Sequence, residues 1–362
     1  MTDCAWKPNW EEAKRHYTEW WEHRGLVLDL WGGPPANPPH EDVADPGPAP
    51  DIETHYTDAA WRGKSNHYRL SRGQYPADAL PQAAVDIGPG SLALILGARP
   101  GLRYDTVWYW PCWEGIDEPE KLPPVRFDPG SPWWRAHEAA LRECVRLGRG
   151  KYFTGCPDLI ENADILASLR GMLPMLEDMV VRPDWVVEKI AEINRAWFEA
   201  YDRVYDIIRL ADGGSCFSAF HIWGPGKTAK LQCDCSASFS PAMFKRFVVP
   251  ALSGQCEWLD HSLFHLDGEH CIRHLDLLLS IKALDAIEWT PNPKVPSGGD
   301  PRWYEMYNKI LHAGKSVQAV GINPDQVKPL LDACGGKGMF IMSNTNSLSE
   351  IERLIKVVEP YR

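Results

Sequence analysis

The chain of 362 residues lacks several features that would assign its class at once. Its longest apolar run, near residues 91–98, is far too short to span a bilayer. Residues 1–7 show no basic segment followed by an apolar one, as a secretory signal would. The ten cysteines are scattered without a pair of CxxC motifs, which argues against a closed zinc ribbon. We therefore expect a cytoplasmic protein with free thiols.

The chain also lacks an excess of positive charge: 49 acidic residues outnumber 38 basic ones, so the formal net charge is −11 at pH 7. Nucleic acids and anionic membranes need basic surface, so we expect neither as a partner. The glycine-rich segments 88–90 and 224–226 lack the Gly-Lys-Ser/Thr ending of a phosphate loop, and no GxGxxG follows an early strand. These exclusions leave a small molecule as the expected partner, and a homodimer is compatible with the sequence.

Tryptophan, in contrast, is abundant, with 17 residues. Core packing accounts for some of them, but several lie beside Pro- and Gly-rich loops, among them Trp31 and the run Trp108-Tyr109-Trp110 before Pro111. Aromatic faces bind sugars, aryl groups and cations well. We therefore predict a small, uncharged or cationic ligand stacked on Trp108 and Trp110.

Strand-like and helix-like segments alternate along the chain. Strands are expected at 25–31, 151–156, 215–223, 262–266, 284–289, 316–320 and 338–342, with weaker candidates near 85 and 105. Helices are expected at 9–22, 163–179 and 183–209, and from Ser240 through Phe247. This alternation is typical of a parallel sheet. We predict one α/β domain over 1–362, a single (β/α)8 barrel with an N-terminal extension and long loops; a doubly wound open sheet is the alternative.

Residues 33–60 are rich in Pro, Asp and Gly and are expected to form a long loop or a lid within this domain.

Polar side chains stand where the expected strands end. His265 and Asp267 close one strand, Glu288 closes the next, and Asp158 follows another. In a βα-repeat protein the carboxyl ends of the strands form the catalytic face. His265, Asp267, Glu288 and Asp158 are therefore the candidate catalytic residues, although Asp158 could instead cap the helix that follows.

Further residues near these ends are candidates for substrate binding. His221 and Trp223 end one apolar run, Trp289 follows Glu288, and His270 follows the glycine turn after Asp267. Cys233 precedes the helix that begins at Ser240, where it could contact a substrate or a metal, but a buried thiol is the favoured explanation.

Several of these segments resemble the uroporphyrinogen decarboxylase superfamily, which includes methyltransferases of methanogens and acetogens. The resemblance is carried by residues 88–93, 157–171, 232–244 and 265–276, which include Ser-Pro-x-x-Phe at 240–244 and His-x-x-Gly at 265–268. It extends over most of the chain and implies a single (β/α)8 barrel, in agreement with the alternation above.

The chain departs from both well-known members of that superfamily. The decarboxylase has arginines after its first strand that bind porphyrin carboxylates, whereas residues 31–35 here read Trp-Gly-Gly-Pro-Pro. The zinc methyltransferases use His-x-Cys and a further Cys at the final strand. This chain keeps His265 but has Asp267 in place of the first Cys, and residues 340–344 contain no Cys. We therefore expect neither porphyrinogen decarboxylation nor a thiolate zinc site of that type.

The resemblance to the methyltransferase-like members implies a methyltransferase or demethylase that acts on a small methylated substrate, with a corrinoid protein as methyl acceptor. His265, Asp267 and Glu288 would either hold a divalent metal such as zinc or act as acid–base groups without one. The alternative is a lyase or decarboxylase of a small acid or sugar-like substrate on the same barrel, since fold does not decide function.

Overall fold

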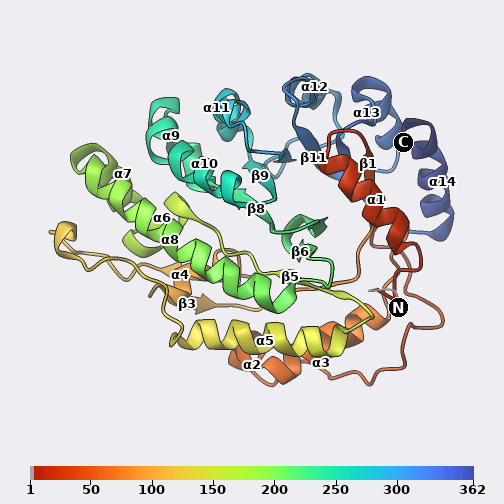
Figure 1. Ribbon diagram of the computed structural model, residues 1–362, viewed down its shortest axis with the longest axis horizontal. Helices are drawn as coiled ribbons and strands as arrows, with labels where there is room; N and C mark the ends of the chain where they lie inside the picture. Colours follow the sequence, from red (N-terminus) through yellow and green to blue (C-terminus); the bar gives the residue numbers. More distant parts are fainter. Residues whose placement is uncertain (1–3) are drawn as a thin grey trace.

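Parallel strands occupy the centre of the molecule and helices surround them (Figure 1). The computed structural model describes residues 4–362, so the start of the segment 1–7 lies outside the described residues. A six-stranded parallel sheet has the order β1 (Leu26–Trp31), β12 (Met339–Asn344), β11 (Ser316–Ile322), β10 (Ala286–Thr290), β9 (His261–Asp267) and β8 (Thr228–Gln232). A second sheet contains β2 (Gln82–Ala83), β5 (Phe153–Cys156), β6 (Ser215–Phe217) and β7 (Ile222–Gly224), of which β7 is antiparallel to β6.

The hydrogen bonds of the described strands form these two sheets and a separate two-stranded hairpin, and not one continuous ring. The sheets are nevertheless neighbours, because β6 lies against β8 and Asp29 of β1 forms an antiparallel bridge with Ala77, just before β2. The structure thus shows a mixed α/β fold built on a six-stranded parallel sheet. The closed eight-stranded barrel stays a prediction.

Fourteen α-helices are present within residues 4–362, and several of them pack directly on the strands. Their bounds are α1 (Trp10–Trp21), α2 (Ile52–Thr57), α3 (Ala59–Ser71), α4 (Ser91–Ile95), α5 (Pro132–Gly148), α6 (Asn162–Arg170), α7 (Met172–Val181), α8 (Pro183–Ile208), α9 (Pro241–Phe247), α10 (Val249–Trp258), α11 (Leu275–Ser280), α12 (Tyr304–His312), α13 (Val327–Cys334) and α14 (Leu348–Val358). The expected cap of α9 is confirmed, because Ser240 Oγ accepts a hydrogen bond from Met243 N at 3.2 Å.

Three expected elements differ from the structure for local reasons. The helix expected at 163–179 is divided at Gly171, whose φ of 94° favours glycine and interrupts the helix between α6 and α7. The strand expected at 215–223 is the hairpin of β6 and β7, because Phe220 adopts a left-handed φ of 58° between them. The weak strand near 105 belongs to a separate antiparallel hairpin, β3 (Arg99–Leu102) with β4 (Val107–Trp110).

Two other segments also depart from the expectation. The sequence pattern missed β8, in which buried Lys230 interrupts an apolar run. The segment 33–60 contains α2 and reaches the first residues of α3, so only its earlier part is an irregular loop.

Helix α1 packs across the beginnings of the central strands and accounts for much of the tryptophan content. Trp20 Nε1 donates to the carbonyls of Val317 and Gly338 at 3.3 and 3.1 Å, which lie at the starts of β11 and β12. Trp21 Nε1 donates to Trp223 O at 2.9 Å, and the ring of Trp223 meets Trp10 edge-on at 5.2 Å. These tryptophans pack in the core. Packing under α1, and not stacking on a ligand, therefore explains this part of the high tryptophan content.

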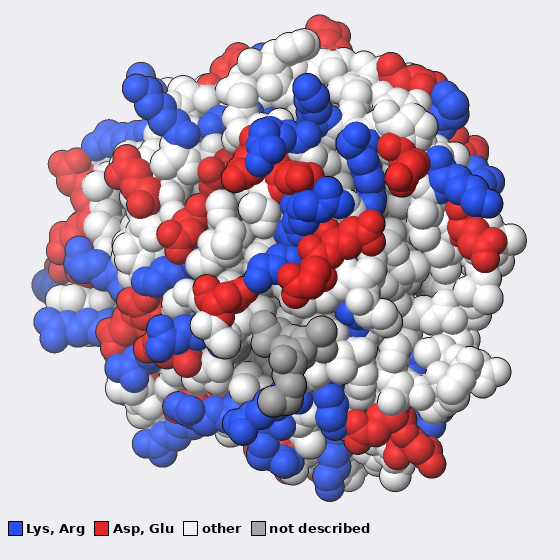
Figure 2. Space-filling model, turned by 45° about the vertical axis from the view of Figure 1, so that its right-hand side comes forward, with Lys and Arg blue, Asp and Glu red and all other residues white. Residues whose placement is uncertain are grey.

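Acidic and basic side chains alternate over most of the face drawn in Figure 2. Among residues 4–362, no helix combines the length and the apolar character needed to cross a membrane.

Replacement of Trp20 by Ala should destabilise the protein by about 3–5 kcal/mol, because it leaves a cavity beneath α1 and removes the indole hydrogen bonds to two backbone carbonyls. Trp108 is 59% exposed, so Trp108→Ala serves as the matched control and should change the stability by no more than about 0.5 kcal/mol. Chemical denaturation followed by tryptophan fluorescence and circular dichroism measures both variants. Equal midpoints for the two variants would contradict the role given to α1.

Candidate active site

A row of polar side chains crosses the carboxyl half of the six-stranded sheet. In the register of the parallel strands, Gln232 of β8 is paired with His265 of β9, His265 with Glu288 of β10, and Glu288 with Gln318 of β11. Paired residues of neighbouring strands project from the same face. The four side chains therefore lie side by side in a sheet whose strands are otherwise mostly apolar.

His265 and Glu288 form the central pair of this row. His265 Nδ1 donates to Glu288 Oε2, and Thr290 Oγ1 donates to Glu288 Oε1 at 2.6 Å. Glu288 is fully buried. Burial alone would lower the pKa of His265, but the charge and the hydrogen bond of Glu288 outweigh it, so the pKa is raised above 6.5. Because Nδ1 is engaged, Nε2 is the atom of His265 that a substrate or an ion could use.

Asp234 and Asp267 stand next to His265. One ligand atom from each of the three residues can be chosen so that all lie within 4.8 Å of one another. Desolvation and the nearby charge of Asp164 raise the pKa of Asp234 to about 7, although its side chain is exposed at the surface. One imidazole nitrogen and two carboxylates suit a borderline or hard divalent ion, and a carboxylate behind the imidazole is a common way to orient such a ligand. The residues therefore fit a metal, with Asp234 in the set and Glu288 behind His265.

Asp158 forms an ion pair with a buried lysine. Lys230 Nζ lies 2.9 and 2.8 Å from the two carboxylate oxygens of Asp158 and also contacts Gln232 Oε1. Burial lowers the pKa of Lys230, but Asp158 and Glu161 outweigh this effect and raise it. A buried ammonium group needs such partners. The pair connects the end of β5 with β8 and lies beside the His265 cluster through Gln232, which donates to Asp234 Oδ2 at 2.7 Å.

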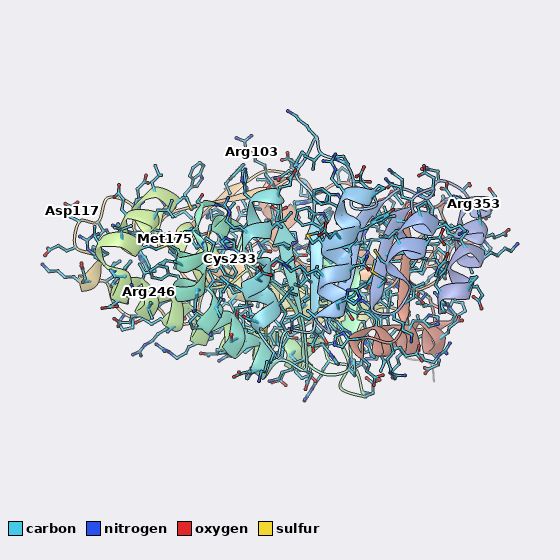
Figure 3. The ribbon with its side chains drawn as sticks, turned by 90° about the horizontal axis from the view of Figure 1, so that it is seen from above. Arg103, Asp117, Met175, Cys233, Arg246 and Arg353 are labelled. Carbon is cyan, nitrogen blue, oxygen red and sulfur yellow. The ribbon has the colours of Figure 1, made fainter. Side chains whose placement is uncertain are left out.

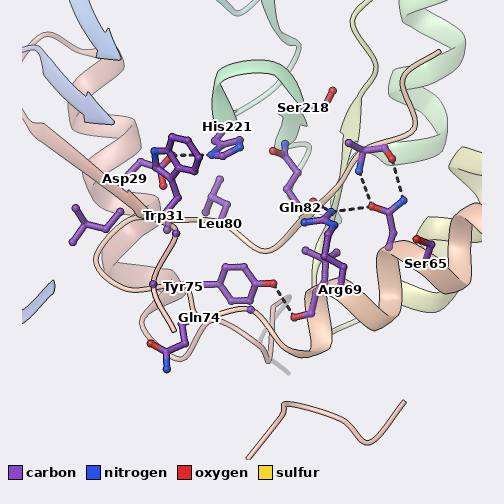
Figure 4. Close-up of a pocket in the computed structure, with 18 of the residues that line it drawn as sticks. Asp29, Trp31, Ser65, Arg69, Gln74, Tyr75, Leu80, Gln82, Ser218 and His221 are labelled. Carbon is purple, nitrogen blue, oxygen red and sulfur yellow. Dashed lines mark hydrogen bonds and ion pairs between the residues drawn. The ribbon is translucent and has the colours of Figure 1, made fainter. Parts of the chain in front are cut away.

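A cavity of about 660 Å³ opens beside the ends of β1 and β6, with α3 as its opposite wall (Figure 4). Its lining includes Asp29, Trp31, His55, Trp61, Arg62, Ser65, Asn66, Arg69, Tyr75, Gln82, Ser218 and His221. His221 Nδ1 donates to Asp29 Oδ2 at 2.9 Å, whereas the buried Asp29 Oδ1 has no hydrogen-bond partner among the described residues. A buried acceptor without a partner favours a ligand that donates to it.

The segment Ser218–His221 separates this cavity from His265. Ser218 and His221 line the cavity, while the ring of Phe220 lies 4.8 Å from the ring of His265. Phe220 O accepts from Gln318 Nε2 at 2.7 Å, and both Phe220 and His221 have left-handed φ values, 58° and 52°. The insertion between β6 and β7 thus divides the polar strand ends into two regions.

Several residues expected to bind substrate lie outside the lining of this cavity. Trp108 and Trp110 project from the β3–β4 hairpin and are exposed, and His270 is exposed beside Arg273. Trp223 and Trp289 are fully buried, the latter against Trp303 at 4.9 Å between ring centres. The structure brings His221 to the cavity and places Cys233 beside Cys235, with 3.7 Å between their sulfur atoms.

The sequence reasoning missed Asp29, Asp234 and Lys230. Asp29 and Lys230 are charged residues inside apolar strands. This pattern could have identified them, because a buried charge requires a partner. Asp234 follows β8, a strand that the pattern did not predict, so its position at a strand end was hidden.

No protein-family model matches the chain, and no curated protein matches it. Among solved structures, the chain is similar to a methyltransferase from Methanosarcina mazei, with a TM-score of 0.61 over 96% of this chain and 98% of that chain. The sequence identity is 10%, so the likeness shows a shared fold and leaves the activity to be argued from the site.

Replacement of Asp29 by Asn should lower the pKa of His221. Burial lowers this pKa, but the charge and hydrogen bond of Asp29 outweigh it in the native protein and raise the pKa above 6.5. Stability from this pair is therefore fully present below about pH 6.5 and is lost as the pH rises through the raised value. Asp29→Asn should be most destabilising on the acidic side.

Titration of the histidine ring resonances by NMR measures this shift directly. The resonance of His261 is the internal control, since burial already holds its pKa at about 4 and Asp29 is not among the groups that perturb it. An unchanged His221 titration in a folded Asp29→Asn variant would refute the pairing.

Proposed function

We propose that this chain is an enzyme that transfers or removes the methyl group of a small methylated substrate. The observation that carries the proposal is the His265–Glu288 pair, in which a buried carboxylate holds an imidazole whose second nitrogen has no hydrogen-bond partner within residues 4–362. An alkoxide or amide is too basic to depart unaided, so loss of a methyl group from oxygen or nitrogen requires a proton donor or a Lewis acid at the heteroatom. The fold shared with a methyltransferase supports this class.

In this proposal His265 donates a proton from Nε2 to the departing heteroatom, and Glu288 is a positioning residue. Glu288 raises the pKa of His265 against the effect of burial, which favours the protonated form of the imidazole. Lys230 holds Asp158 beside the same cluster, where Asp158 can orient water or a polar group of the substrate.

The cavity lined by Trp31 and Trp61 is the proposed substrate-binding site. Its two tryptophans offer aromatic faces, and the unpaired oxygen of Asp29 accepts a hydrogen bond or attracts a cationic group. We infer a small uncharged or cationic ligand, in line with the acidic composition, with Trp31 and Trp61 in the role predicted for Trp108 and Trp110. Because Phe220 lies between this cavity and His265, the reacting end of the substrate would reach His265 only with the Phe220 ring displaced.

Where a metal binds, His265, Asp234 and Asp267 would hold it, and it would supply a Lewis acid for the departing heteroatom. A corrinoid protein is proposed as the methyl acceptor, as the superfamily resemblance implies. Both assignments are proposals that rest on the donor set and on the resemblance.

His265→Gln should reduce kcat by about 100-fold or more while ligand affinity stays within about tenfold, since the side chain acts in bond cleavage. Trp31→Ala should weaken binding first, because an aromatic contact contributes about 0.5–2 kcal/mol. Isothermal calorimetry and single-turnover assays over a panel of methyl ethers and methylamines, with a corrinoid acceptor, measure the two effects. Trp108→Ala, outside the cavity, is the control and should change neither quantity. Equal losses of affinity in His265→Gln and Trp31→Ala would show that this division of roles is wrong.

If a hard or borderline divalent ion binds at this site, each of the variants His265→Ala, Asp234→Asn and Asp267→Asn should lose its affinity for that ion. The reason is that each variant removes one of three converging ligands. Isothermal titration with Mn²⁺ or Zn²⁺ provides the measurement, and Asp276→Asn, an exposed carboxylate on α11, is the matched control.

A lyase or decarboxylase acting on a small acid is the second candidate, and one observation favours it. Arg69 lines the cavity together with buried Arg62, so a substrate carboxylate would meet positive charge there. An assay without a methyl acceptor separates the two candidates. Release of carbon dioxide or of an unsaturated product in that assay would favour the lyase or decarboxylase over methyl transfer. Arg69→Ala should then abolish binding, whereas it should have little effect on a neutral methylated substrate.

A further inference from the structure

The loop after β8 brings two thiols and a carboxylate together on the side of the strand ends away from the cavity. Cys233 is buried, Cys235 is partly exposed, and Asp164 reaches them from the first turn of α6. Figure 3 shows Cys233 in the interior of the molecule, between the helical end that carries Met175 and the central strands. One ligand atom from each of the three side chains lies within 4.8 Å of the other two.

The spacing of the two sulfur atoms fits a shared metal ion. Their distance is 3.7 Å, and two thiolates bound tetrahedrally at about 2.3 Å from one ion are separated by about 3.8 Å. A disulfide needs about 2.05 Å between the sulfurs, so bond formation would require the loop to move.

Asp164 both shapes this loop and offers a ligand to an ion. Its two carboxylate oxygens accept the backbone N–H groups of Asp234 and Cys235, each at 2.8 Å. Each oxygen has a second lone pair, so the carboxylate can still bind an ion while it fixes the direction of both thiols. Metal-binding carboxylates are commonly held by such hydrogen bonds.

The local charge favours a cation. The nearby cation Lys230 is paired with Asp158, and no salt bridge within residues 4–362 includes Asp164 or Asp234. A divalent ion would offset the carboxylate charge and the cost of deprotonating the buried thiols.

We propose that Cys233, Cys235 and Asp164 form a binding site for a borderline or soft divalent cation, for which Zn²⁺ is the common case. Binding releases one proton from each thiol to solvent, so the ion replaces two protons and no redox change occurs. The partial exposure of Cys235 leaves the fourth coordination position accessible to water or to an added ligand.

This site is distinct from the cluster around His265 in both residues and donor chemistry. Two sulfurs and one oxygen select softer ions than one nitrogen and two carboxylates do. Asp234 lies between the two cysteines in the sequence, yet it belongs to the group formed with His265 and Asp267. The proposal therefore stands whether or not the methyl-transfer function is correct.

Titration of the metal-free, reduced protein with Co²⁺ tests the proposal, because thiolate coordination gives an intense near-ultraviolet charge-transfer band that carboxylate and imidazole ligands do not give. We expect this band to saturate at one equivalent in the native protein. It should be lost in Cys233→Ser and in Cys235→Ser, and Asp164→Asn should weaken Co²⁺ binding by about tenfold or more. The band should persist in His265→Ala.

Cys112→Ser and Cys334→Ser are the matched controls, since both thiols are partly exposed and lie on other elements. Circular dichroism verifies that each variant is folded, and Cys235→Ser, at the more accessible position, keeps the test valid if Cys233→Ser does not fold. Absence of the band in the native protein, or its persistence in Cys235→Ser, would overturn the proposal. Its loss in His265→Ala would show one shared site, and an intact mass lower by two hydrogens without metal uptake would show a disulfide instead.

Discussion

The register between β9 and β10 is the constraint on which the candidate active site depends. It sets His265 opposite Glu288 at the same level of the parallel sheet, so an imidazole and a carboxylate meet inside an apolar layer. A slip of one residue would turn one of the two side chains to the other face and leave a buried charge without a partner. The same strand alignment that the fold requires therefore also forms the candidate site, because only the correctly aligned sheet gives the carboxylate of Glu288 its hydrogen-bond partner.

The ends of the sheet serve different purposes. At the starts of the strands, α1 covers the sheet with tryptophans whose indole N–H groups satisfy carbonyls of β11, β12 and Trp223. At the other end, charged and polar side chains gather because parallel strands deliver their carboxyl ends to one side. The insertion between β6 and β7 then divides that side, with His221 and Asp29 facing the cavity and Phe220 against His265.

Charge explains why both proposed ion sites lie in this region. The chain carries an excess of acidic residues, and several of them converge at the ends of β8 and β9 and on α6. Lys230 forms its salt bridge with Asp158, and within residues 4–362 it forms none with Asp164 or Asp267. Desolvation and the neighbouring carboxylate of Asp164 raise the pKa of Asp234 to about 7, although His265 and Lys230 act in the opposite direction. A bound cation is the alternative way to offset that charge.

The sequence by itself determined the α/β class and most of the strand positions in its last third, because strand and helix periodicities are local. It also pointed to the candidates His265, Asp267 and Glu288, because a polar residue at the end of an apolar strand can be recognised from the order of residues alone. It did not determine that Trp223 and Trp289 are core residues, that Trp31 and Trp61 share a cavity, or that Glu288 stands behind His265 while Asp234 stands beside it. Those facts depend on the packing of α1, the turn at Phe220 and the alignment of strands far apart in the chain. Tertiary structure decided them, since burial and distance between residues separated by tens of positions are set by packing and leave no local pattern in the sequence.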